Sequence, residues 1–466
     1  LMHLLIRNAW SQKPYAIDTL FMYMANMGWN SSMNTAKTVQ MLTDIDPDTG
    51  EYKIPHIIYV DAFASETVAY ADLILPDTTY LERFDCISLL DRPISTAEGP
   101  ADAIRQPVLT PDRDVRPFQD VLIDLGARLQ LPEFVNDDGS ARYTDYPDYI
   151  MNRQSAPGVG SLAGWRGRQG DEHGRGEPNQ DQIKAYIANQ CHWEHTLPES
   201  WQFFKHANRD YLEYAQQMGW LANSDRIVMQ LYCETLQRFR LSAMGHGTVK
   251  APAHYRERLK HFFDPLPFWY APLEEQQTSA HEFPLHAITQ RPMAMYHSWG
   301  SQNAWLRQIH GWNRLYIHAD VAAEHDLADD DWAWLESHNG RIHAQIRTMS
   351  GCNRNTVWTW NAIGKRQGAW NLSADAEESQ KGMLLNDLIN DLLPDGRFGN
   401  ADPITGQAAW FDLRVRISKA EAPGTGLQDT HAAGGVTLPG LEPRPDMLRF
   451  GEQFLPDADF RKRSRS

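Results

Sequence analysis

Three polar stretches of the sequence contain the residue types that bind an anionic cofactor. The first lies at the end of the apolar run 21–28 and precedes a helix-like segment, and its amide and hydroxyl side chains are Asn26, Asn30, Ser31, Ser32 and Asn34. Ligands of open α/β sheets bind beyond the carboxyl ends of the strands, and amide-rich loops that enter a helix suit a phosphate or a purine edge. An ordinary N-capped turn would contain the same residues, so both interpretations stay open.

The second stretch, residues 60–77, places Asp61 at the end of an apolar run and Glu66 with Thr67 at the start of the next helix-like segment. A carboxylate at a strand end can accept two hydrogen bonds from the N1–H and N2–H2 groups of guanine. Capping of the following helix is the commoner role of such an aspartate. The spacing alone does not choose between the two roles.

The third stretch is a long connection, residues 288–306, whose polar side chains are Thr289, Arg291, His297, Ser298, Ser301 and Asn303. A guanidinium group among hydroxyl and amide donors matches the oxygens of a pyrophosphate. A single loop of this kind is weak evidence when taken alone. Each of the three stretches could hold an anionic cofactor, and each also has an ordinary structural interpretation.

Other catalytic motifs are absent from the sequence. It has no Walker loop, HExxH, GxGxxG or Ser-His-Asp order, so hydrolase and nucleotidase hypotheses have no support. The four cysteines lie far apart, which excludes a CxxC ligand run and predicts reduced thiols: Cys86, Cys191, Cys233 and Cys352. Three histidines in a polar segment are spaced too irregularly to predict a metal site: His246, His254 and His261.

The net charge of −16 disfavours nonspecific binding to nucleic acid, because the field of the protein repels a polyphosphate backbone. No apolar run approaches the roughly 20 residues that span a bilayer. The chain begins at Leu1 inside what looks like an established α/β pattern, so we expect a fragment.

Residues 1–132 are predicted to form an α/β domain with a parallel sheet. The expected strands are 21–28, 56–63 and 71–76, and the expected helices are 33–42 and 119–131. The second helix has an apolar stripe of Val121, Leu122, Leu125 and Leu129. These elements would place the first two polar stretches at strand ends.

Residues 133–282 are predicted to be a helical, loop-rich insertion. The polar stretch 160–182 cannot bury a core and is expected at the surface. Helices are expected at 199–221 and at 224–240, the latter with Ser224 as its N-cap.

Residues 283–420 are predicted to form a small β-barrel, followed by a tail, 421–466, that docks or is disordered. The expected strands are 284–289, 314–318, 331–337, 341–349, 356–360 and 412–417. Asn339-Gly340, between two alternating strands, predicts a type I′ hairpin turn with positive φ at both positions.

Segments of this sequence, in this order, resemble the dimethyl sulfoxide reductase superfamily. SETVAYADLILPDTTYLERFD (65–85) is similar to the segment that closes its third domain. TQRPMAMYHSWGSQN (289–303) and ADVAAEHDLADDDWAWLESHNGRIHAQI (319–346) resemble its C-terminal dinucleotide-binding barrel. Leu327-Ala328 and Asp330-Asp331 depart from the usual Gly-Ile and Gly-Asp, which alters a turn and leaves the cofactor loops unaffected.

The resemblance implies a double-psi type of barrel and a bis(molybdopterin guanine dinucleotide) molybdenum cofactor. Contacts with the pterin and pyrophosphate would come from Thr289, Arg291, His297, Ser298 and Asn303, and Asn386 would reach a pterin amide. Asn26, Asn30 and Asp61 would lie near a guanosine together with the neighbouring Ser32, and Asp402 is a weaker candidate. The protein ligand of the molybdenum and any iron–sulfur cluster are expected only in sequence upstream of this chain.

Within the superfamily, residues 80–95 lack a run typical of formate dehydrogenases and periplasmic nitrate reductases. The stretches 23–42, 358–372 and 400–417 most resemble the catalytic subunits of quinone-linked sulfite dehydrogenases. This implies oxidation of sulfite to sulfate at the cytoplasmic face of the membrane. The implied partners are an iron–sulfur electron-transfer subunit, which receives the electrons, and a membrane anchor subunit. Cations that would suit the dianion are Arg240, Arg291, Lys365 and Arg366.

Two alternatives to a sulfite dehydrogenase stay open. A reductase of thiosulfate, polysulfide, tetrathionate or another oxyanion would use the same cofactor in the opposite direction. A cofactor-binding module without catalysis would need no metal ligand.

Overall fold

The computed structural model describes residues 4–30, 33–87, 94–95, 100–152, 192–194, 209–224, 231–272, 274–364, 382–393, 401–405, 413–421, 431–432 and 436–437. Contacts divide the chain into two units. Unit 1 comprises residues 1–75 and 233–466, and unit 2 comprises residues 76–232. These limits differ from the domain boundaries expected at 132 and 282, which stay a prediction.

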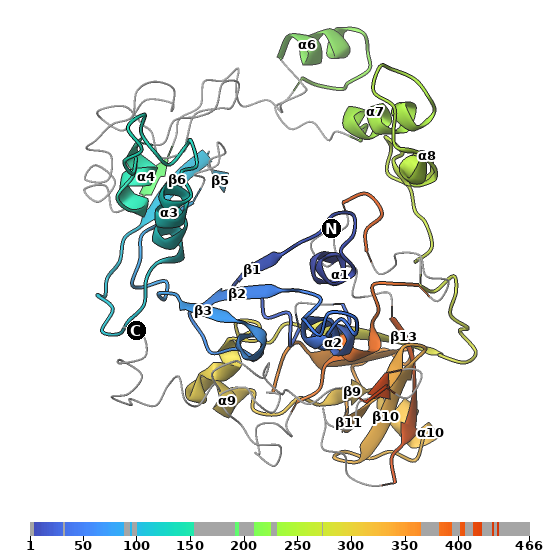
Figure 1. The fold of residues 1–466 in the computed structure, drawn as a ribbon. Helices are drawn as coiled ribbons and strands as arrows, with labels where there is room; N and C mark the ends of the chain where they lie inside the picture. The colour runs from blue at the N-terminus through green and yellow to red at the C-terminus, as the bar shows by residue number, and fades with distance from the viewer. Residues whose placement is uncertain are drawn as a thin grey trace. The chain divides into compact units, whose positions relative to one another are not determined.

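Unit 1 begins with a small α/β layer, drawn in blue in Figure 1. Its sheet has the order β1-β2-β3, formed by Thr19–Tyr23, His56–Asp61 and Leu73–Pro76. Strands β1 and β2 are parallel, with Thr19 opposite His56. The expected parallel pairing is therefore confirmed, although β1 ends at Tyr23 and leaves residues 24–30 as a loop.

Helices α1 (Leu5–Ser11) and α2 (Thr35–Thr43) pack with this sheet around a core that includes Leu20, Ile57 and Tyr59. Helix α2 begins two residues after the predicted start at 33, because Asn34 is its N-cap and the side chain of Asn34 accepts a hydrogen bond from Lys37 N at 2.9 Å. After β2 the chain forms a buried 3₁₀ helix, η2 (Glu66–Tyr70), in place of an α-helix.

Six strands close into a barrel, as the alternating apolar patterns predict. They are β8 (Leu285–Gln290), β9 (Leu315–Ile317), β10 (Trp332–Ser337), β11 (Gly340–Thr348), β12 (Thr356–Trp360) and β13 (Leu413–Lys419). The order is β10-β13-β8-β12-β9-β11, and pairing of β10 with β11 closes the ring. The pairs β8–β12 and β9–β11 are parallel, and the others are antiparallel. Short strands β14 (His431–Ala432) and β15 (Val436–Thr437) extend the sheet at β11.

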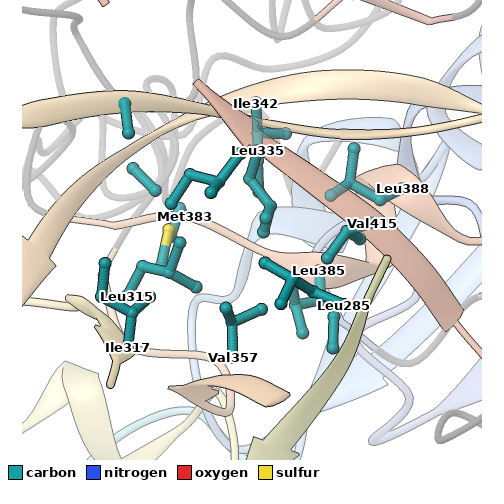
Figure 2. Close-up of a cluster of buried hydrophobic side chains, with 14 of the residues drawn as sticks. Leu285, Leu315, Ile317, Leu335, Ile342, Val357, Met383, Leu385, Leu388 and Val415 are labelled. Carbon is teal, nitrogen blue, oxygen red and sulfur yellow. The ribbon is translucent and has the colours of Figure 1, made fainter. Parts of the chain in front are cut away.

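The barrel core also holds a segment that lies outside its strands. Met383, Leu385 and Leu388 belong to the same buried cluster as Leu335 and Val415 from the barrel strands. Figure 2 shows these side chains converging in the interior. Leu385–Leu388 forms the 3₁₀ helix η7, so packing in the barrel fixes the backbone that carries Asn386.

The β10–β11 hairpin forms, but its predicted turn type is wrong. Ser337 pairs with Gly340, so the two connecting residues are His338 and Asn339. Neither Asn339 nor Gly340 has a positive φ, which excludes type I′ with Asn339-Gly340 at its centre. Within the hairpin, Asn339 N donates to Ser337 Oγ at 3.0 Å, and from outside it the Leu388 carbonyl accepts from Asn339 Nδ2 at 3.0 Å.

Residues 231–272 form a segment that we call the α7–α8 hairpin. It contains α7 (Glu234–Ala243), η4 (Ala253–Tyr255) and α8 (Arg256–Phe262). The single helix expected over 224–240 is wrong, because residues 231–233 are not helical and α7 begins after Cys233. The structure also describes η5 (Gly300–Gln302), α9 (Ala304–Ile309) and α10 (Ala319–Glu324) in unit 1.

Unit 2 contains an antiparallel sheet that the sequence did not predict. Strand β6 (Pro100–Arg105) pairs with β4 (Asp85–Ile87), β5 (Ile94–Ser95) and β7 (His192–Glu194). Its helices in the described residues are α3 (Phe118–Arg128), α4 (Tyr146–Asn152) and α6 (Arg209–Gln217). The loop before β4 is fixed by a buried ion pair between Arg83 and Asp77.

Helix α3 confirms the helix expected at 119–131, but its apolar stripe is not its buried face. Leu122, Leu125 and Leu129 are exposed, whereas Ile123 and Gly126 are buried. Gly126 lies against the ring of Phe134, which a Cβ atom would overlap at 2.6 Å. The face of α3 that carries Gly126 is therefore the one that packs, because a residue without a Cβ atom lets the ring of Phe134 approach closely.

The predicted surface stretch 160–182 and most of the predicted tail lie outside the described residues. Among the helices that the structure describes, none has the length and apolar character needed to cross a membrane.

Candidate cofactor-binding site

The three polar stretches meet in unit 1, and Asn26 is the residue that joins them. Its Nδ2 donates to Glu66 Oε2 at 2.8 Å and to Ser298 Oγ at 3.0 Å. Its Oδ1 accepts from Thr67 N at 3.1 Å and from Thr67 Oγ1 at 2.8 Å. The side chain of Asn26 is fully buried, so these four bonds satisfy a carboxamide that has no access to water.

Asp61 forms a second connection between the sheet and the loop after β8. Its Oδ2 accepts from Trp299 Nε1 at 3.0 Å, from Tyr59 Oη at 2.8 Å and from Ser65 Oγ at 3.2 Å. Its Oδ1 accepts from Phe63 N at 3.0 Å. Burial raises the pKa of the Asp61 carboxyl, and the hydrogen bonds from Trp299 and Tyr59 offset part of that rise.

Asn30 and Asn386 form the third connection. Asn386 Nδ2 donates to the backbone carbonyl of Asn30 at 3.0 Å, and Asn30 Nδ2 donates to Asn361 Oδ1 at 3.2 Å. Trp29 Nε1 donates to the Ala362 carbonyl at 3.4 Å. The loop after β1 is thereby tied both to the η7 segment and to the loop after β12.

The loop after β8 has a constrained backbone. His297 has a φ of 47°, a conformation that is uncommon for residues other than glycine and that gathers at functional sites. A Cβ atom on Gly300 would lie 2.9 Å from Met295 Cα, so the loop closes tightly on itself. Ser301 Oγ donates to the Ser298 carbonyl at 2.9 Å, and Asn303 caps α9 by accepting from Trp305 N at 2.9 Å.

Four of the predicted residues have side chains that reach solvent, unlike the buried residues of this network. Arg291 and Asn303 are exposed, and Thr289 and His297 are half-buried. Arg291 makes no hydrogen bond or ion pair with any residue that the structure describes. Burial lowers the pKa of the His297 imidazole, and the charge of Arg291 lowers it further.

This donor set fits a pyrophosphate-containing cofactor. A guanidinium group that is not engaged by a carboxylate matches phosphate oxygens, and Thr289 adds a hydroxyl group at the end of β8. The described residues contain no group of three or more His, Cys, Asp or Glu side chains that could hold a metal ion. Amide, hydroxyl and guanidinium groups are therefore the chemistry that this site offers.

One of the two remaining predicted residues, Asp402, forms its hydrogen bonds outside this network. Ser32 lies outside the described residues. Asp402 turns back on its own loop, where its Oδ1 accepts from Ile404 N at 3.0 Å and from Thr405 Oγ1 at 2.9 Å. Arg240, a candidate for binding a dianion, is paired with Asp264 at 2.6 Å.

Some roles in the site were not predicted from the sequence. Trp299, which was not singled out, holds Asp61, and Glu66 and Thr67, which were expected only to begin a helix, hold Asn26. Asn313 donates to the carbonyls of Trp360 at 2.9 Å and Met383 at 3.0 Å, which ties β12 to the segment before η7. The position of Asn313 just before a predicted strand was the available signal, although it does not identify the partners.

Comparisons with known proteins agree with this geometry. Residues 285–395 match the family model described as "Molydopterin dinucleotide binding domain". The chain is 51% identical over 452 residues to a sulfite dehydrogenase subunit of Allochromatium vinosum, which covers 96% of this chain and 46% of that protein. It is 24% identical over 378 residues to "Thiosulfate reductase molybdopterin-containing subunit PhsA" of Salmonella typhimurium, which covers 78% of this chain and 40% of that protein.

Among solved structures, the chain is similar to acetylene hydratase from Pelobacter acetylenicus. The TM-score is 0.57 at 16% identity, covering 89% of this chain and 46% of that one, so this likeness concerns the fold alone. The chain spans less than half the length of the sulfite dehydrogenase and thiosulfate reductase relatives. The residue motifs, the closed barrel and these matches agree, and the chain belongs to the molybdopterin oxidoreductases of the dimethyl sulfoxide reductase superfamily, with its dinucleotide-binding domain at residues 285–395.

Proposed function

We propose that unit 1 binds the dinucleotide arms of a bis(molybdopterin guanine dinucleotide) cofactor. The observation that carries this proposal is the joining of three loops, because Asn26 binds Ser298 and Asp61 binds Trp299 at the carboxyl ends of β1 and β2. Binding sites of open α/β sheets lie at such strand ends. The double-psi barrel type and the guanosine position near Asp61 belong to this proposal.

The network separates two kinds of role in the proposed site. The side chains of Asn26 and Asp61 direct their hydrogen bonds to other residues of the chain, so we assign them to holding the loops in place. The groups that would contact the pyrophosphate belong to Arg291, Thr289 and His297. A neutral His297 imidazole donates one hydrogen bond and adds no charge beside Arg291.

The complete enzyme is proposed to oxidise sulfite to sulfate. This reaction takes one oxygen atom from water and releases two protons and two electrons. The molybdenum cofactor, when bound, supplies the oxygen transfer and the two-electron redox chemistry. The support is the 51% identity to a sulfite dehydrogenase subunit over 96% of this chain. Transfer of the electrons through an iron–sulfur subunit to a membrane-anchored quinone site is part of the same proposal.

Reduction of thiosulfate or a related oxyanion is the second candidate, because a relative at 24% identity is a thiosulfate reductase subunit. The complete enzyme should be assayed with sulfite plus ferricyanide and with thiosulfate plus reduced viologen. Activity in the first assay is expected. Activity only in the second assay would reject the sulfite proposal while retaining the family assignment.

Cofactor binding can be tested separately from activity. The chain should be produced in a host that makes the molybdenum cofactor, and the guanosine monophosphate released by acid should be quantified per chain. Arg291→Gln is expected to lower that content severalfold. Arg354→Gln is the matched control, because Arg354 is an exposed cation of the same unit that pairs with Glu324 at 2.5 Å. Equal nucleotide content in both variants would show that Arg291 does not bind the cofactor. A folded wild-type chain that releases no nucleotide would contradict the binding proposal.

A further inference from the structure

A two-pronged ion pair joins helix α1 to the segment that follows η7. Arg7 Nη2 donates to Asp391 Oδ1 at 2.5 Å, and Arg7 Nε donates to Asp391 Oδ2. The two residues are 384 positions apart in the sequence. Both side chains are largely enclosed, since 17% of Arg7 and 7% of Asp391 is exposed. Two parallel hydrogen bonds fix the orientation of the two groups as well as their distance.

The pair is isolated from other charges. Within the described part of the chain, neither Arg7 nor Asp391 has a second ion-pair partner. Removing two charges from water costs free energy, and the attraction between them does little more than offset that cost. Apolar side chains of similar volume often give equal or greater stability at such a position. A role in geometry therefore accounts for the pair better than a role in stability does.

The pair lies beside the loop after β1, residues 24–30. Arg7 is on α1, and its neighbour Ile6 belongs to the core of the α/β layer. Arg7 and Asp391 line one small cavity together with six residues of α1, the loop after β1 and α2: Ile6, Met27, Met33, Asn34, Thr38 and Met41. Since Met27 lies between Asn26 and Asn30 in the sequence, the pair borders the loop that carries both residues into the candidate site.

Asp391 follows η7, which other contacts fix to the barrel. Asn313 Nδ2 donates to the Met383 carbonyl at 3.0 Å, and Ser337 Oγ donates to the Leu388 carbonyl at 2.8 Å. These bonds hold the segment on the side of the barrel. The ion pair holds the same segment on the side of α1, so the segment connects the two parts of unit 1.

We propose that Arg7 and Asp391 are positioning residues for the cofactor. Asn386 Nδ2 donates to the Asn30 carbonyl at 3.0 Å, and the pair fixes α1 against the chain just after Asn386, so that this bond forms at the right distance. The pair acts through Asn386 and the loop, and neither of its residues is assigned a contact with the cofactor. This inference rests on the proposed binding of the cofactor by unit 1.

The decisive variant removes both charges at once. Arg7→Met with Asp391→Leu replaces the pair with apolar side chains, which should leave the free energy of unfolding close to that of the wild type. Positioning would still be lost, because apolar contacts do not fix an orientation. The chain should be produced in a host that makes the molybdenum cofactor, and the guanosine monophosphate retained after dialysis should be quantified. We expect the retained amount to fall about fivefold, the effect of one lost hydrogen bond.

Single variants supply the contrast. Asp391→Asn and Arg7→Met each leave one enclosed charge without its partner, so each should lower both the stability and the nucleotide content. A purely structural pair predicts that nucleotide content follows stability and is restored in the double variant. Lys53→Met with Asp44→Leu is the matched control, because it removes another ion pair of the α/β layer, at 2.7 Å and at the far end of α2. Its nucleotide content should equal that of the wild type.

Amide hydrogen exchange of the chain without cofactor separates this inference from the binding proposal. In the double variant, exchange of residues 24–30 should be faster than in the wild type, while exchange of the barrel strands stays unchanged. This measurement decides whether the pair fixes the loop even if the folded wild-type chain retains no nucleotide, which would contradict the binding proposal. Wild-type exchange of residues 24–30 in the double variant, or full nucleotide content at wild-type stability, would overturn the positioning role.

Discussion

The side-chain amide of Asn26 donates to the hydroxyl group of Ser298 at 3.0 Å, across 272 residues of sequence. The same amide group donates to Glu66, so one buried side chain joins the sheet, the 3₁₀ helix after it and the loop after β8. A buried carboxamide whose donors and acceptors are all engaged fixes its surroundings, because any displacement leaves a polar group unsatisfied.

Asn26→Asp tests this arrangement with almost no change in shape. The new carboxylate would face Glu66 in a buried site and would have no N–H group to donate. We expect the free energy of unfolding to fall by on the order of 3 kcal/mol at neutral pH. The deficit should shrink as the pH falls, because protonation of the introduced aspartate removes the repulsion.

Urea unfolding of the wild type and the variant at several pH values measures the effect of Asn26→Asp. Asn355→Asp is the control, since Asn355 is exposed and its change should stay within about 0.5 kcal/mol. A deficit that is independent of pH would argue against a carboxylate pair at this position.

Asp61 should make the stability of unit 1 depend on pH with a defined sign. Burial raises the pKa of its carboxyl in the folded protein above the ordinary value of 3.8, so the folded state holds a proton that the unfolded state has lost. Stability from this group is complete below pH 3.8 and is lost as the pH rises through the folded pKa.

Asp61→Asn removes this titration. The unfolding free energy of the wild type should therefore fall relative to that of Asp61→Asn as the pH rises from 3.8. Unfolding series in urea over the acidic range, with Asp402→Asn as the control outside the network, measure this difference. A difference that is flat across the range would show that Asp61 titrates alike in both states.

The architecture could be predicted from the sequence where residues alternate with a regular period. All six barrel strands were predicted, because buried residues such as Leu335 and Val415 alternate with residues that face outward. Strands β4, β5 and β6 of unit 2 were not predicted. Their sequences, DCI, IS and PADAIR, are short and carry no apolar alternation, so only their pairing defines them.

The candidate site could be predicted only in part. Asp61 ends β2, and Asn26 and Ser298 lie in the loops after β1 and β8, so their positions beyond strand ends indicate a ligand site. Their partners depend on contacts across the chain, such as that of Trp299 with Asp61 over 238 residues, which no local pattern contains. The β10–β11 turn shows the same limit, because the Leu388 carbonyl selects its conformation from outside the hairpin.

Glu82 and Arg113 should give unit 2 its resistance to acid. The hydrogen bond from Arg113, at 2.6 Å, lowers the pKa of the Glu82 carboxyl from 4.5 to about 2. Stability from this pair is complete above pH 4.5 and is lost as the pH falls through about 2. Arg113→Met should raise the pKa of Glu82 towards 4.5 and shift the acid unfolding of unit 2 to higher pH.

Acid titration followed by circular dichroism measures the shift caused by Arg113→Met. Arg128→Met is the control, because it also removes an ion pair of unit 2, at 3.0 Å from Asp124, without touching Glu82. Equal shifts in the two variants would assign the effect to net charge and not to the pair.

Leu388 should contribute more to the site than its apolar side chain suggests. Its side chain is fully buried in the barrel core, while its carbonyl accepts from Ser337 Oγ at 2.8 Å and from Asn339 Nδ2 at 3.0 Å. Leu388→Ala leaves a cavity and should lower the free energy of unfolding by about 2–5 kcal/mol. Because η7 also carries Asn386, the bond from Asn386 to the Asn30 carbonyl should loosen, and the guanosine monophosphate retained per chain should fall.

Leu129→Ala, on the exposed face of α3, should change stability by less than about 0.5 kcal/mol and leave the nucleotide content as it is. A Leu388→Ala chain that is destabilised as expected but retains full nucleotide content would show that the barrel core does not position Asn386 for binding.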